Sequence, residues 1–331
     1  MFIMKAAYYQ SFGPACEVLQ SGELEKPLPG PGEVLVKLAS SGVNPSDVKK
    51  RMGAVPGLLD SGLVVPHSDG AGVIESVGDG VPAARMGERV WVYQAQHARQ
   101  FGTAAEYVAL KSCRAVSLPG NTAYDVGACI GIPLMTSHRC VFADGPVEGK
   151  TLVVTGGVGR VGHYAIQWAN QAGAKVIATA STAEDRESCI DAGACRVVNH
   201  HDADWAEQVV RANDGDKVDR VIDVEFGVNL PSVLDMIHTS GAIVTYGSTV
   251  VTEPTLPFYR MMYLDLMVRF VIVYEMPETA KELAIDDITV ALQQDRLKHR
   301  IAHALPLHEI ARSHELIEQG GFRGCVVLQI T

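Results

Sequence analysis

Three glycines form a pattern that could bind a nucleotide. Gly157, Gly159 and Gly162 are spaced as G-x-G-x-x-G, between an apolar run typical of a buried strand (152–155) and a run typical of a helix (161–172). Glycine at the first two positions permits a tight turn and a close approach of a pyrophosphate, and glycine at the third lets helix and strand pack closely. Many such patterns are only glycine-rich turns, but this context predicts a dinucleotide at the helix N-terminus. Its expected contacts are Gly157, Val158, Gly159, Arg160 and Val161.

The residues after the second predicted strand (176–180) indicate whether NAD or NADPH would bind. NAD-preferring sites usually place an acidic residue at the end of this strand, where it binds the ribose 2′-hydroxyl. Here the strand (176–180) is followed by Ser181 and Thr182, whose small hydroxyl side chains leave room for a 2′-phosphate. Arg186 could pair with that phosphate, or it could be an ordinary solvated helix residue. The sequence therefore favours NADPH.

Strands and helices alternate around the glycine motif, which is typical of a parallel sheet covered by helices on both faces. By contrast, residues 5–118 contain short β-type runs separated by turns, which predicts a compact, mostly β domain. A helix at 307–318 and a further strand at 325–330 are expected near the end of the chain. The other predicted strands are 34–38, 71–77, 89–93, 105–109, 152–155, 176–180, 197–198, 220–224 and 243–246.

Composition and charge argue against several classes of protein. The net charge of −10 disfavours a nucleic-acid partner, because binding along a phosphate backbone requires a basic face. No apolar run approaches the ~20 residues of a membrane span, and no signal peptide is expected. The seven cysteines include no C-x-x-C pair and are interpreted as reduced thiols. We therefore expect a cytoplasmic protein without membrane contact, and its 331 residues suggest two domains.

Motifs spread over nearly the whole chain resemble those of a known family. They are Gly42-Val-Asn44-Pro-Ser-Asp47, Pro66-His-Ser-Asp69-Gly-Ala-Gly72-Val, Gly87-Glu-Arg-Val-Trp91, the glycine turn, Leu297-Lys-His-Arg300 and the closing segment 320–328. With them, the chain resembles the zinc-independent quinone oxidoreductase branch of the medium-chain dehydrogenase/reductase superfamily. The resemblance implies an α/β protein with a discontinuous, mostly β GroES-like catalytic domain (1–124 and 297–331). It also implies a Rossmann-type domain with a doubly wound parallel sheet that binds the dinucleotide (125–296).

Zinc-dependent relatives hold a catalytic metal with a Cys, a His and a second Cys or acidic residue. In this chain Asn44, Ser68 and a residue near Ile132 stand at those positions, whereas tetrahedral zinc sites require thiolate, imidazole or carboxylate. His67 and His97 could coordinate a metal, but a lone histidine is more often a surface or hydrogen-bonding residue. We therefore expect no bound metal.

The resemblance also implies roles for individual polar residues. Asn44 resembles the family residue beside the nicotinamide, where it would bind a ribose hydroxyl or the substrate oxygen, although it could be only a turn residue. Asp47 and Ser68 would complete the polar end of the site, and Asp47 could equally cap the following helix. Lys49 stands where relatives often have a Tyr. The predicted catalytic residues are therefore Asn44, Asp47, Ser68 and Lys49. Cofactor contacts are further implied for Asn44, Thr136, Tyr246, Gly247 and Ser248.

The chain departs from the family pattern at positions near the cofactor phosphates. Relatives often have a Lys near Asp185 that contacts the 2′-phosphate, and a Tyr at the position of His200. A positive contact would then come from Arg186, His200 or Arg323. The segment 223–227 also differs from the small residues usual at this point.

These features together predict an NADPH-dependent enzyme that transfers hydride to a quinone or an α,β-unsaturated carbonyl compound without zinc. Conjugated acceptors are favoured because their developing charge spreads to an oxygen that a hydrogen-bond donor or water can protonate. Two alternatives remain open: an enoyl or acrylyl-type alkene reductase, and a non-catalytic NADPH-binding redox sensor. Family habit favours a homodimer, and the apolar segment 258–273 could be core or a dimer surface.

Overall fold

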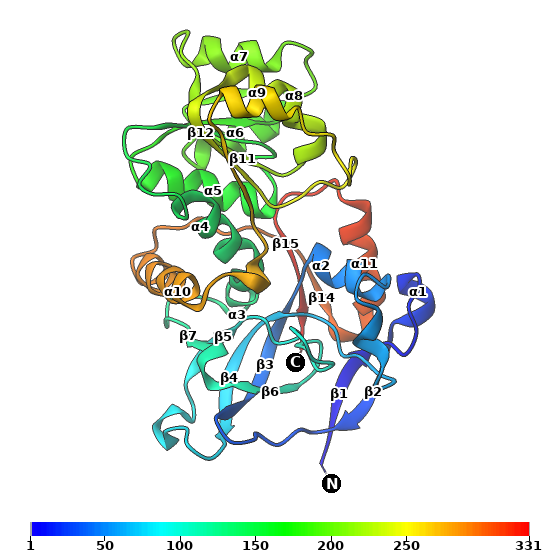
Figure 1. Cartoon of the computed structure of the whole chain (residues 1–331). Coiled ribbons are helices and arrows are strands. Elements are labelled where there is room, and N and C mark those ends of the chain that lie inside the picture. The colour runs from blue at the N-terminus through cyan, green and yellow to red at the C-terminus, as the bar shows by residue number, and fades with distance from the viewer. Residues whose placement is uncertain (1, 331) are drawn as a thin grey trace. The chain divides into compact units, whose positions relative to one another are not determined.

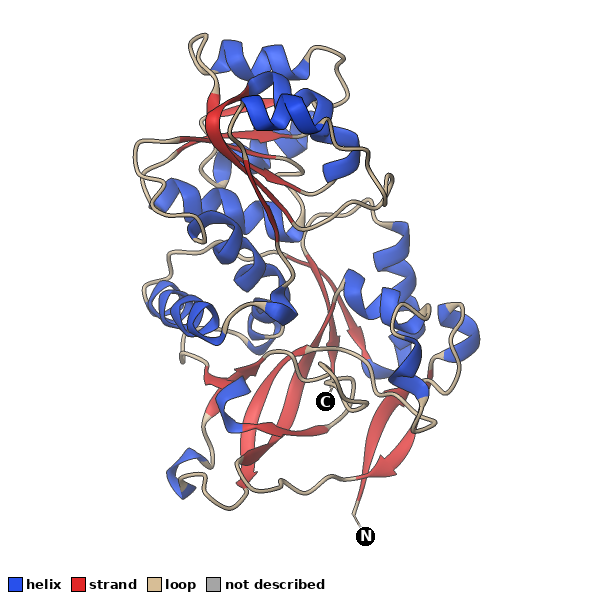
Figure 2. Ribbon diagram, in the orientation of Figure 1, coloured by secondary structure: helices blue, strands red, loops and turns tan. Residues whose placement is uncertain are grey.

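The computed structural model describes residues 2–330, which form two compact units. The first unit comprises the described residues of Met1–Ile132 and Ile285–Thr331, and the second is Pro133–Ala284. Figure 1 follows the chain through each unit by colour, and Figure 2 distinguishes helices from strands. The domain limits predicted from the sequence, after residues 124 and 296, remain a proposal about which segments fold together.

The first unit is built mainly of antiparallel strands. Within the described residues, its larger sheet has the order β14-β15-β3-β4-β5-β7, with β6 also paired to β3, and β1 and β2 form a separate hairpin. β15 pairs antiparallel with β3, so segments from opposite ends of the chain lie side by side. The strands are β1 (Ile3–Tyr8), β2 (Gln20–Glu25), β3 (Glu33–Val43), β4 (Asp69–Val77), β5 (Arg89–Val92), β6 (Tyr107–Lys111), β7 (Ala115–Ser117), β14 (Ile301–Pro306) and β15 (Cys325–Gln329).

The core of the first unit lies between its strands. Apolar side chains of β3, β4, β6 and β15 gather in one buried cluster that includes Val36, Ile74, Val108 and Leu328. Each such side chain contributes about 1.5–3 kcal/mol when removed from water. The helices are α1 (Ala15–Val18), α2 (Pro45–Arg51), α3 (Tyr124–Gly127) and α11 (Ile310–Gln319), together with α10 (Glu278–Gln293), which spans the limit of the two units in sequence. Shorter helical turns are η1 (Pro56–Leu59), η2 (Ala83–Arg85), η3 (Ser112–Arg114), η4 (Ile130–Leu134) and η6 (Leu307–Glu309).

The second unit contains a parallel sheet. In the described part of the chain, the sheet has six strands in the order β10-β9-β8-β11-β12-β13, and every pairing is parallel. The strands are β8 (Thr151–Val154), β9 (Lys175–Thr179), β10 (Arg196–Val198), β11 (Val218–Asp223), β12 (Ile237–Thr245) and β13 (Met267–Phe270). The helices are α4 (Met135–Phe142), α5 (Arg160–Gln171), α6 (Ala183–Asp191), α7 (Trp205–Ala212), α8 (Phe226–Met236) and α9 (Phe258–Tyr263), with a short turn η5 (Val273–Glu275).

The predicted fold class is confirmed by these two units. In the second unit, all of β8 and all of β9 except Lys175 are buried, as the apolar runs indicated, because helices cover the faces of a parallel sheet. The sequence did not predict β13, which forms an edge of this sheet within the segment 258–273. Among residues 2–330, no helix has both the length and the apolar character needed to cross a membrane.

Candidate active site and nucleotide site

The glycine motif forms a tight turn between β8 and α5. β8 ends at Val154, and α5 begins at Arg160 with Gly159 as its N-cap. Between them, Gly156 adopts φ = +61°, a left-handed conformation that favours glycine, and its carbonyl oxygen accepts from the Gly159 N–H at 2.9 Å. The turn places the N-terminus of α5 at the carboxyl end of β8, the position where helix N–H groups bind phosphate in such folds.

Close packing explains why other positions of the turn are also glycine. A Cβ atom at Gly162 would lie 2.3 Å from the carbonyl oxygen of Gly156, and one at Gly157 would lie 2.7 Å from Sγ of Cys189. A side chain at either position would therefore push the turn and its surroundings apart. The sequence assigns the tight turn to Gly157 and Gly159, whereas the left-handed residue is Gly156. The adjacent pair Gly156-Gly157 was the available signal.

Side chains at three strand ends hold the turn in place. The Thr155 hydroxyl donates to Asp223 Oδ1 at 2.6 Å and accepts from the Val224 N–H at 2.9 Å. Thr179, at the end of β9, accepts from the Gly156 N–H at 3.0 Å through its own hydroxyl. The sequence analysis missed Thr155 and noted Asp223 only as part of a departure from the family. A hydroxyl directly after an apolar strand and before two glycines was the signal that could have identified Thr155.

Asp223 is a fully buried acid at the end of β11. Burial raises its pKa, and hydrogen bonds from Thr155 and Asn229 limit that shift. Its Oδ2 atom has no hydrogen-bond partner among the described residues. The raised pKa favours the neutral acid, which reduces the negative charge beside the turn expected to receive a pyrophosphate.

The predicted 2′-phosphate contacts after β9 are on the surface of the second unit. Ser181 is exposed, and Thr182 caps α6 because its Oγ1 accepts from the Asp185 N–H at 3.1 Å. Arg186 is also exposed, and its guanidinium donates to the Val197 carbonyl oxygen in β10 at 2.7 Å. This bond holds the arginine beside the ends of β9 and β10, with further N–H groups available for an anion.

The two other cations proposed from the sequence differ from Arg186. His200 is half-buried, and burial lowers its pKa, with His201 adding to the effect. This shift favours the neutral imidazole of His200, so a positive contact from His200 stays a prediction. Arg323 belongs to the first unit, in the segment just before β15, whereas the glycine turn belongs to the second. Arg186 is bonded directly to β10 in the second unit.

The remaining predicted cofactor contacts lie on three segments of the second unit. Thr136 is buried near the start of α4, and Tyr246, Gly247 and Ser248 directly follow β12. Ser248 Oγ accepts from the Gly227 N–H at 2.9 Å, so the segment after β12 is tied to the start of α8. The half-buried residues of the turn and of the start of α5 are Val158, Arg160 and Val161.

A buried polar cluster lies in the first unit, where β4 begins. Asp69 is fully buried, and its Oδ2 accepts from the Asn44 side-chain amide at 3.0 Å and from the Ile132 N–H at 2.8 Å. The Asn44 N–H donates to Asp47 Oδ2 at 2.9 Å, so Asp47 has the helix-capping role at α2. The predicted residues Asn44, Asp47 and Ser68 thus gather around Asp69, to which the sequence analysis gave no role.

The surroundings of Asp69 favour its neutral form. Burial raises the pKa of Asp69 to about 8, with Asp47 adding to the shift and hydrogen bonds from Ile132 and Asn44 opposing it. At neutral pH the group is therefore mostly protonated. A neutral carboxyl keeps its two acceptor contacts and avoids the cost of a buried negative charge.

Two adjacent lysines of α2 have different surroundings. Lys49, a predicted catalytic residue, is exposed and makes no hydrogen bond to the cluster within the described chain. Lys50 is half-buried, and its ammonium donates to Ser68 Oγ at 3.3 Å and to Gln96 Oε1 at 3.1 Å. Successive helix residues point about 100° apart, so only one of the two can face the cluster. The side chain of Lys50, and not that of Lys49, reaches the polar cluster.

His67 forms hydrogen bonds to neighbouring side chains, which is the role the sequence analysis weighed against metal coordination. Its Nδ1 lies 2.8 Å from the Ser41 hydroxyl, and its Nε2 lies 3.0 Å from Nε2 of His314. Burial lowers the pKa of His67 to about 3, and Lys50 contributes to the shift. Both ring nitrogens are therefore engaged by neighbouring side chains in a neutral imidazole.

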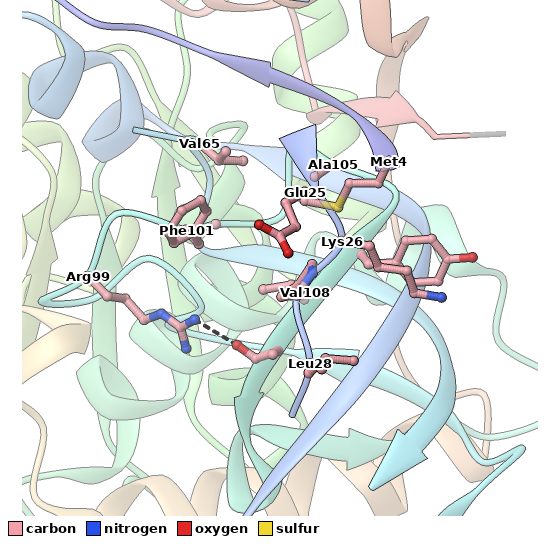
Figure 3. A pocket seen from close by; sticks show the side chains of 13 residues that line it. Met4, Glu25, Lys26, Leu28, Val65, Arg99, Phe101, Ala105 and Val108 are labelled. Atoms are coloured by element: carbon pink, nitrogen blue, oxygen red, sulfur yellow. Dashed lines mark hydrogen bonds between the residues drawn. The ribbon is translucent and has the colours of Figure 1, made fainter. Parts of the chain in front are cut away.

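A cavity of about 380 Å³ lies elsewhere in the first unit, beside β2 and β6 (Figure 3). Arg99 at its wall donates to the Ala109 carbonyl oxygen at 2.7 Å, the dashed line in the figure. Labelled lining residues are Met4, Glu25, Lys26, Leu28, Val65, Arg99, Phe101, Ala105 and Val108. None of the predicted site residues lines this cavity.

Known proteins similar to the chain cover both units. Residues 30–120 match the alcohol dehydrogenase GroES-like domain, and residues 161–289 match the zinc-binding dehydrogenase family. A quinone oxidoreductase of Homo sapiens is 28% identical over 330 residues, 98% of either chain. A quinone oxidoreductase of Mus musculus is 33% identical over 252 residues, which cover 74% of this chain and 73% of the relative. The chain belongs to the quinone oxidoreductase branch of the medium-chain dehydrogenase/reductase superfamily.

Solved structures agree with this assignment. A mycobacterial quinone oxidoreductase superimposes with a TM-score of 0.86 at 26% identity, over 98% of this chain and 99% of that one. A mycobacterial protein complexed with NADPH gives a TM-score of 0.85 at 26% identity, with the same coverage. This protein is thus a quinone oxidoreductase-like enzyme with a GroES-like and a Rossmann-type part.

The polar cluster contains Asn44 and Ser68, which the sequence resemblance places, with a residue near Ile132, at the expected zinc-ligand positions. Asn44 is bonded to Asp69, Ser68 accepts from Lys50, and Ile132 has an apolar side chain. This donor set does not fit zinc, which takes thiolate, imidazole or carboxylate ligands. Across residues 2–330, no three His, Cys, Asp or Glu side chains are grouped so as to hold a metal ion.

Replacing Asp69 with Asn should change how stability depends on pH. The pKa of Asp69 is raised from 3.8 to about 8, so the folded chain keeps a proton that the unfolded chain releases. The free energy of unfolding of the wild type should therefore fall as pH rises from about 4 to about 8, by up to about 1.4 kcal/mol per unit from this group. Urea denaturation of Asp69→Asn at pH 5, 6.5 and 8 should lack this component. Asp79→Asn, which alters an exposed carboxyl, is the control, and an unchanged pH slope in Asp69→Asn would contradict the assignment.

Proposed function

We propose that this enzyme uses NADPH to transfer hydride to quinones or other conjugated carbonyl compounds, without zinc. The observation that carries the proposal is the donor set where zinc-dependent relatives hold a Lewis acid. Here an amide, a hydroxyl and an ammonium group surround a buried carboxyl. Such groups polarise a carbonyl oxygen less strongly than a metal does, so they suit acceptors whose charge is delocalised. Quinones and enones are acceptors of that kind.

The nucleotide site supports NADPH as the hydride source. Glycines at 156, 157 and 162 allow a turn too tightly packed for a Cβ atom, and the pyrophosphate would lie against the N–H groups at the start of α5. Ser181 and Thr182 follow β9 without a carboxylate, and Arg186 would pair with the 2′-phosphate. When bound, NADPH would supply the hydride that reduces the acceptor carbon.

The residues of the polar cluster would orient the acceptor. Asn44 retains a second amide hydrogen beyond the one directed to Asp69, and Ser68 carries a hydroxyl, so both can bind a substrate or ribose oxygen. Asp69 holds the Asn44 amide in one orientation. Because Asp69 is mostly neutral, it does not oppose negative charge developing on a nearby oxygen.

We also propose a homodimer formed through β13. This strand is at the edge of the parallel sheet and pairs only with β12 among the described strands. Large apolar side chains on and before it are exposed, including Tyr263 at 77% and Phe270 at 69%. An unpaired strand edge next to apolar surface is suited to association, and a two-fold axis lets two copies cover the same patch.

We further propose that the protein acts in the cytoplasm and has no nucleic-acid partner. None of the seven cysteines is in a disulfide, which is usual in a reducing compartment. The net charge of −10 disfavours attraction to a phosphate backbone.

An acceptor panel tests the proposed reaction. Purified enzyme with NADPH should reduce 1,4-benzoquinone and 2-cyclohexenone faster than crotonyl thioester, and dialysis against a zinc chelator should leave the rate unchanged. The measurement is the loss of NADPH absorbance, with a reaction lacking acceptor as the control. Preference for the thioester would favour an enoyl or acrylyl-type reductase instead. NADPH binding without oxidation by any acceptor would favour a redox sensor.

Arg186→Ala should weaken NADPH binding selectively. Loss of a charged hydrogen bond to the 2′-phosphate costs about 1.5–3 kcal/mol, so KM for NADPH should rise at least roughly tenfold. KM for NADH, which lacks this phosphate, should stay the same. Arg211→Ala on α7 removes another exposed arginine and serves as the control. An equal rise in KM for NADPH and for NADH would show that Arg186 does not bind the 2′-phosphate.

Charge placed on the β13 edge should separate the proposed dimer. The double variant Tyr263→Glu, Phe270→Lys should sediment as a monomer at concentrations where the wild type is dimeric, because charged side chains resist burial. Leu283→Lys alters an apolar side chain of α10 that is also exposed, and should remain dimeric. A monomeric wild type, or a double variant that still dimerises, would exclude this interface.

A further inference from the structure

Lys50 brings a cation into the polar cluster. Its ammonium group donates to Ser68 Oγ at 3.3 Å, to Gln96 Oε1 at 3.1 Å and to the Gln96 carbonyl oxygen at 3.4 Å. The first and last of these bonds are longer than the usual N–H···O range of about 2.7–3.2 Å. These bonds are therefore long enough for one to be exchanged for a bond to a substrate oxygen at small cost.

Burial makes the proton of Lys50 easier to release. Burial lowers the pKa of Lys50, while Asp47 on α2 and Asp69 on β4 partly oppose the shift. His67 also faces the ammonium and stays neutral, because its own pKa is lowered to about 3. A lysine that is easier to deprotonate is a better acid near neutral pH.

The backbone beside Lys50 is held in an uncommon conformation. His67, immediately before Ser68, has φ = +79°, and Gln94, two residues before Gln96, has φ = +53°. Neither residue is glycine, so each costs about 1 kcal/mol or more, and such strain gathers at functional sites. The segments that carry Ser68 and Gln96, whose oxygens accept from Lys50, therefore both contain a residue in a strained backbone conformation.

We propose that Lys50 is the proton donor to the oxygen of the conjugated acceptor. This inference rests on the proposed function. Ser68, its hydrogen-bond partner, stands where zinc-dependent relatives place a histidine ligand, so the ammonium acts in the region where those relatives use a metal. A positive N–H group there both stabilises a developing oxyanion and can protonate it.

The step balances for an enone. Hydride, released from a C–H bond of NADPH as it is oxidised to NADP⁺, would form a bond to the β-carbon. The π electrons shift toward the carbonyl oxygen, and an O–H bond forms as one N–H bond of Lys50 breaks. The resulting enol rearranges to the saturated ketone. The neutral amine of Lys50 then regains a proton from water, which returns the enzyme to its starting state.

Lys50→Met tests the assignment directly. Because general acid catalysis contributes about 10²–10⁴-fold, kcat with 2-cyclohexenone should fall roughly 100-fold or more while KM for NADPH stays unchanged. Lys37→Met, which removes an exposed lysine of β3, should keep wild-type kcat and is the matched control. Circular dichroism and thermal melting identify any variant that fails to fold.

The pH profile separates proton donation from a structural role. With Asp69→Asn present in both enzymes to remove the titration of Asp69, whose pKa is about 8, kcat should fall as alkaline pH deprotonates Lys50. In this background Lys50→Arg should be slower at neutral pH but should not show that fall, because arginine stays charged. An unchanged kcat in Lys50→Met, a rise in KM for NADPH alone, or an identical alkaline limb in Lys50→Arg would overturn the inference. Failure of the wild type to oxidise NADPH with every acceptor would instead remove the proposed function, and the inference with it.

Discussion

The candidate active site depends on one buried carboxyl group, that of Asp69. It joins three segments that are distant in the sequence: the residue before α2, the first residue of β4 and the turn η4 near residue 132. A carboxylate this deeply buried without a bonded cation would be costly, and the protein avoids that cost by favouring the protonated form. The orientation of Asn44, and with it the polar end of the site, follows from this single contact.

The second unit also contains a buried acid that accepts hydrogen bonds, Asp223. Asp223 ends β11 and receives the Thr155 hydroxyl, which in turn binds the backbone after β11. Two neighbouring strands are thereby joined just where the chain enters the glycine turn. In each unit a buried acid with a raised pKa fixes a backbone segment expected to meet a ligand. A raised pKa favours the neutral form of the acid, which fixes geometry with less repulsion toward a nearby negative charge.

The sequence predicts the fold better than the details of the site. Five strands of the parallel sheet and the glycine turn follow from apolar runs and glycine spacing, which are local signals. β13 was missed because residues 258–273 are apolar without a clear period, and an edge strand is defined by its neighbour. The choice between Lys49 and Lys50 depends on which face of a short helix meets β4, and seven residues of α2 give no periodicity to decide it. The shifts at Asp69 and His200 arise from burial by distant segments, which no local pattern contains.

One thiol lies directly against the nucleotide turn. The Cys189 sulfur fills the space where Gly157 would carry a side chain, and Cys189 is completely shielded from solvent. Quinones and enones are electrophiles that add to thiolates, so an enzyme that turns them over is exposed to alkylation by its own substrates. Adducts would form first on the accessible Cys16, Cys113 and Cys195, while the sulfur whose modification would disrupt the turn stays protected. The packing that requires glycine at residue 157 thus also shields the sulfur of Cys189 from the electrophiles that the enzyme is proposed to reduce.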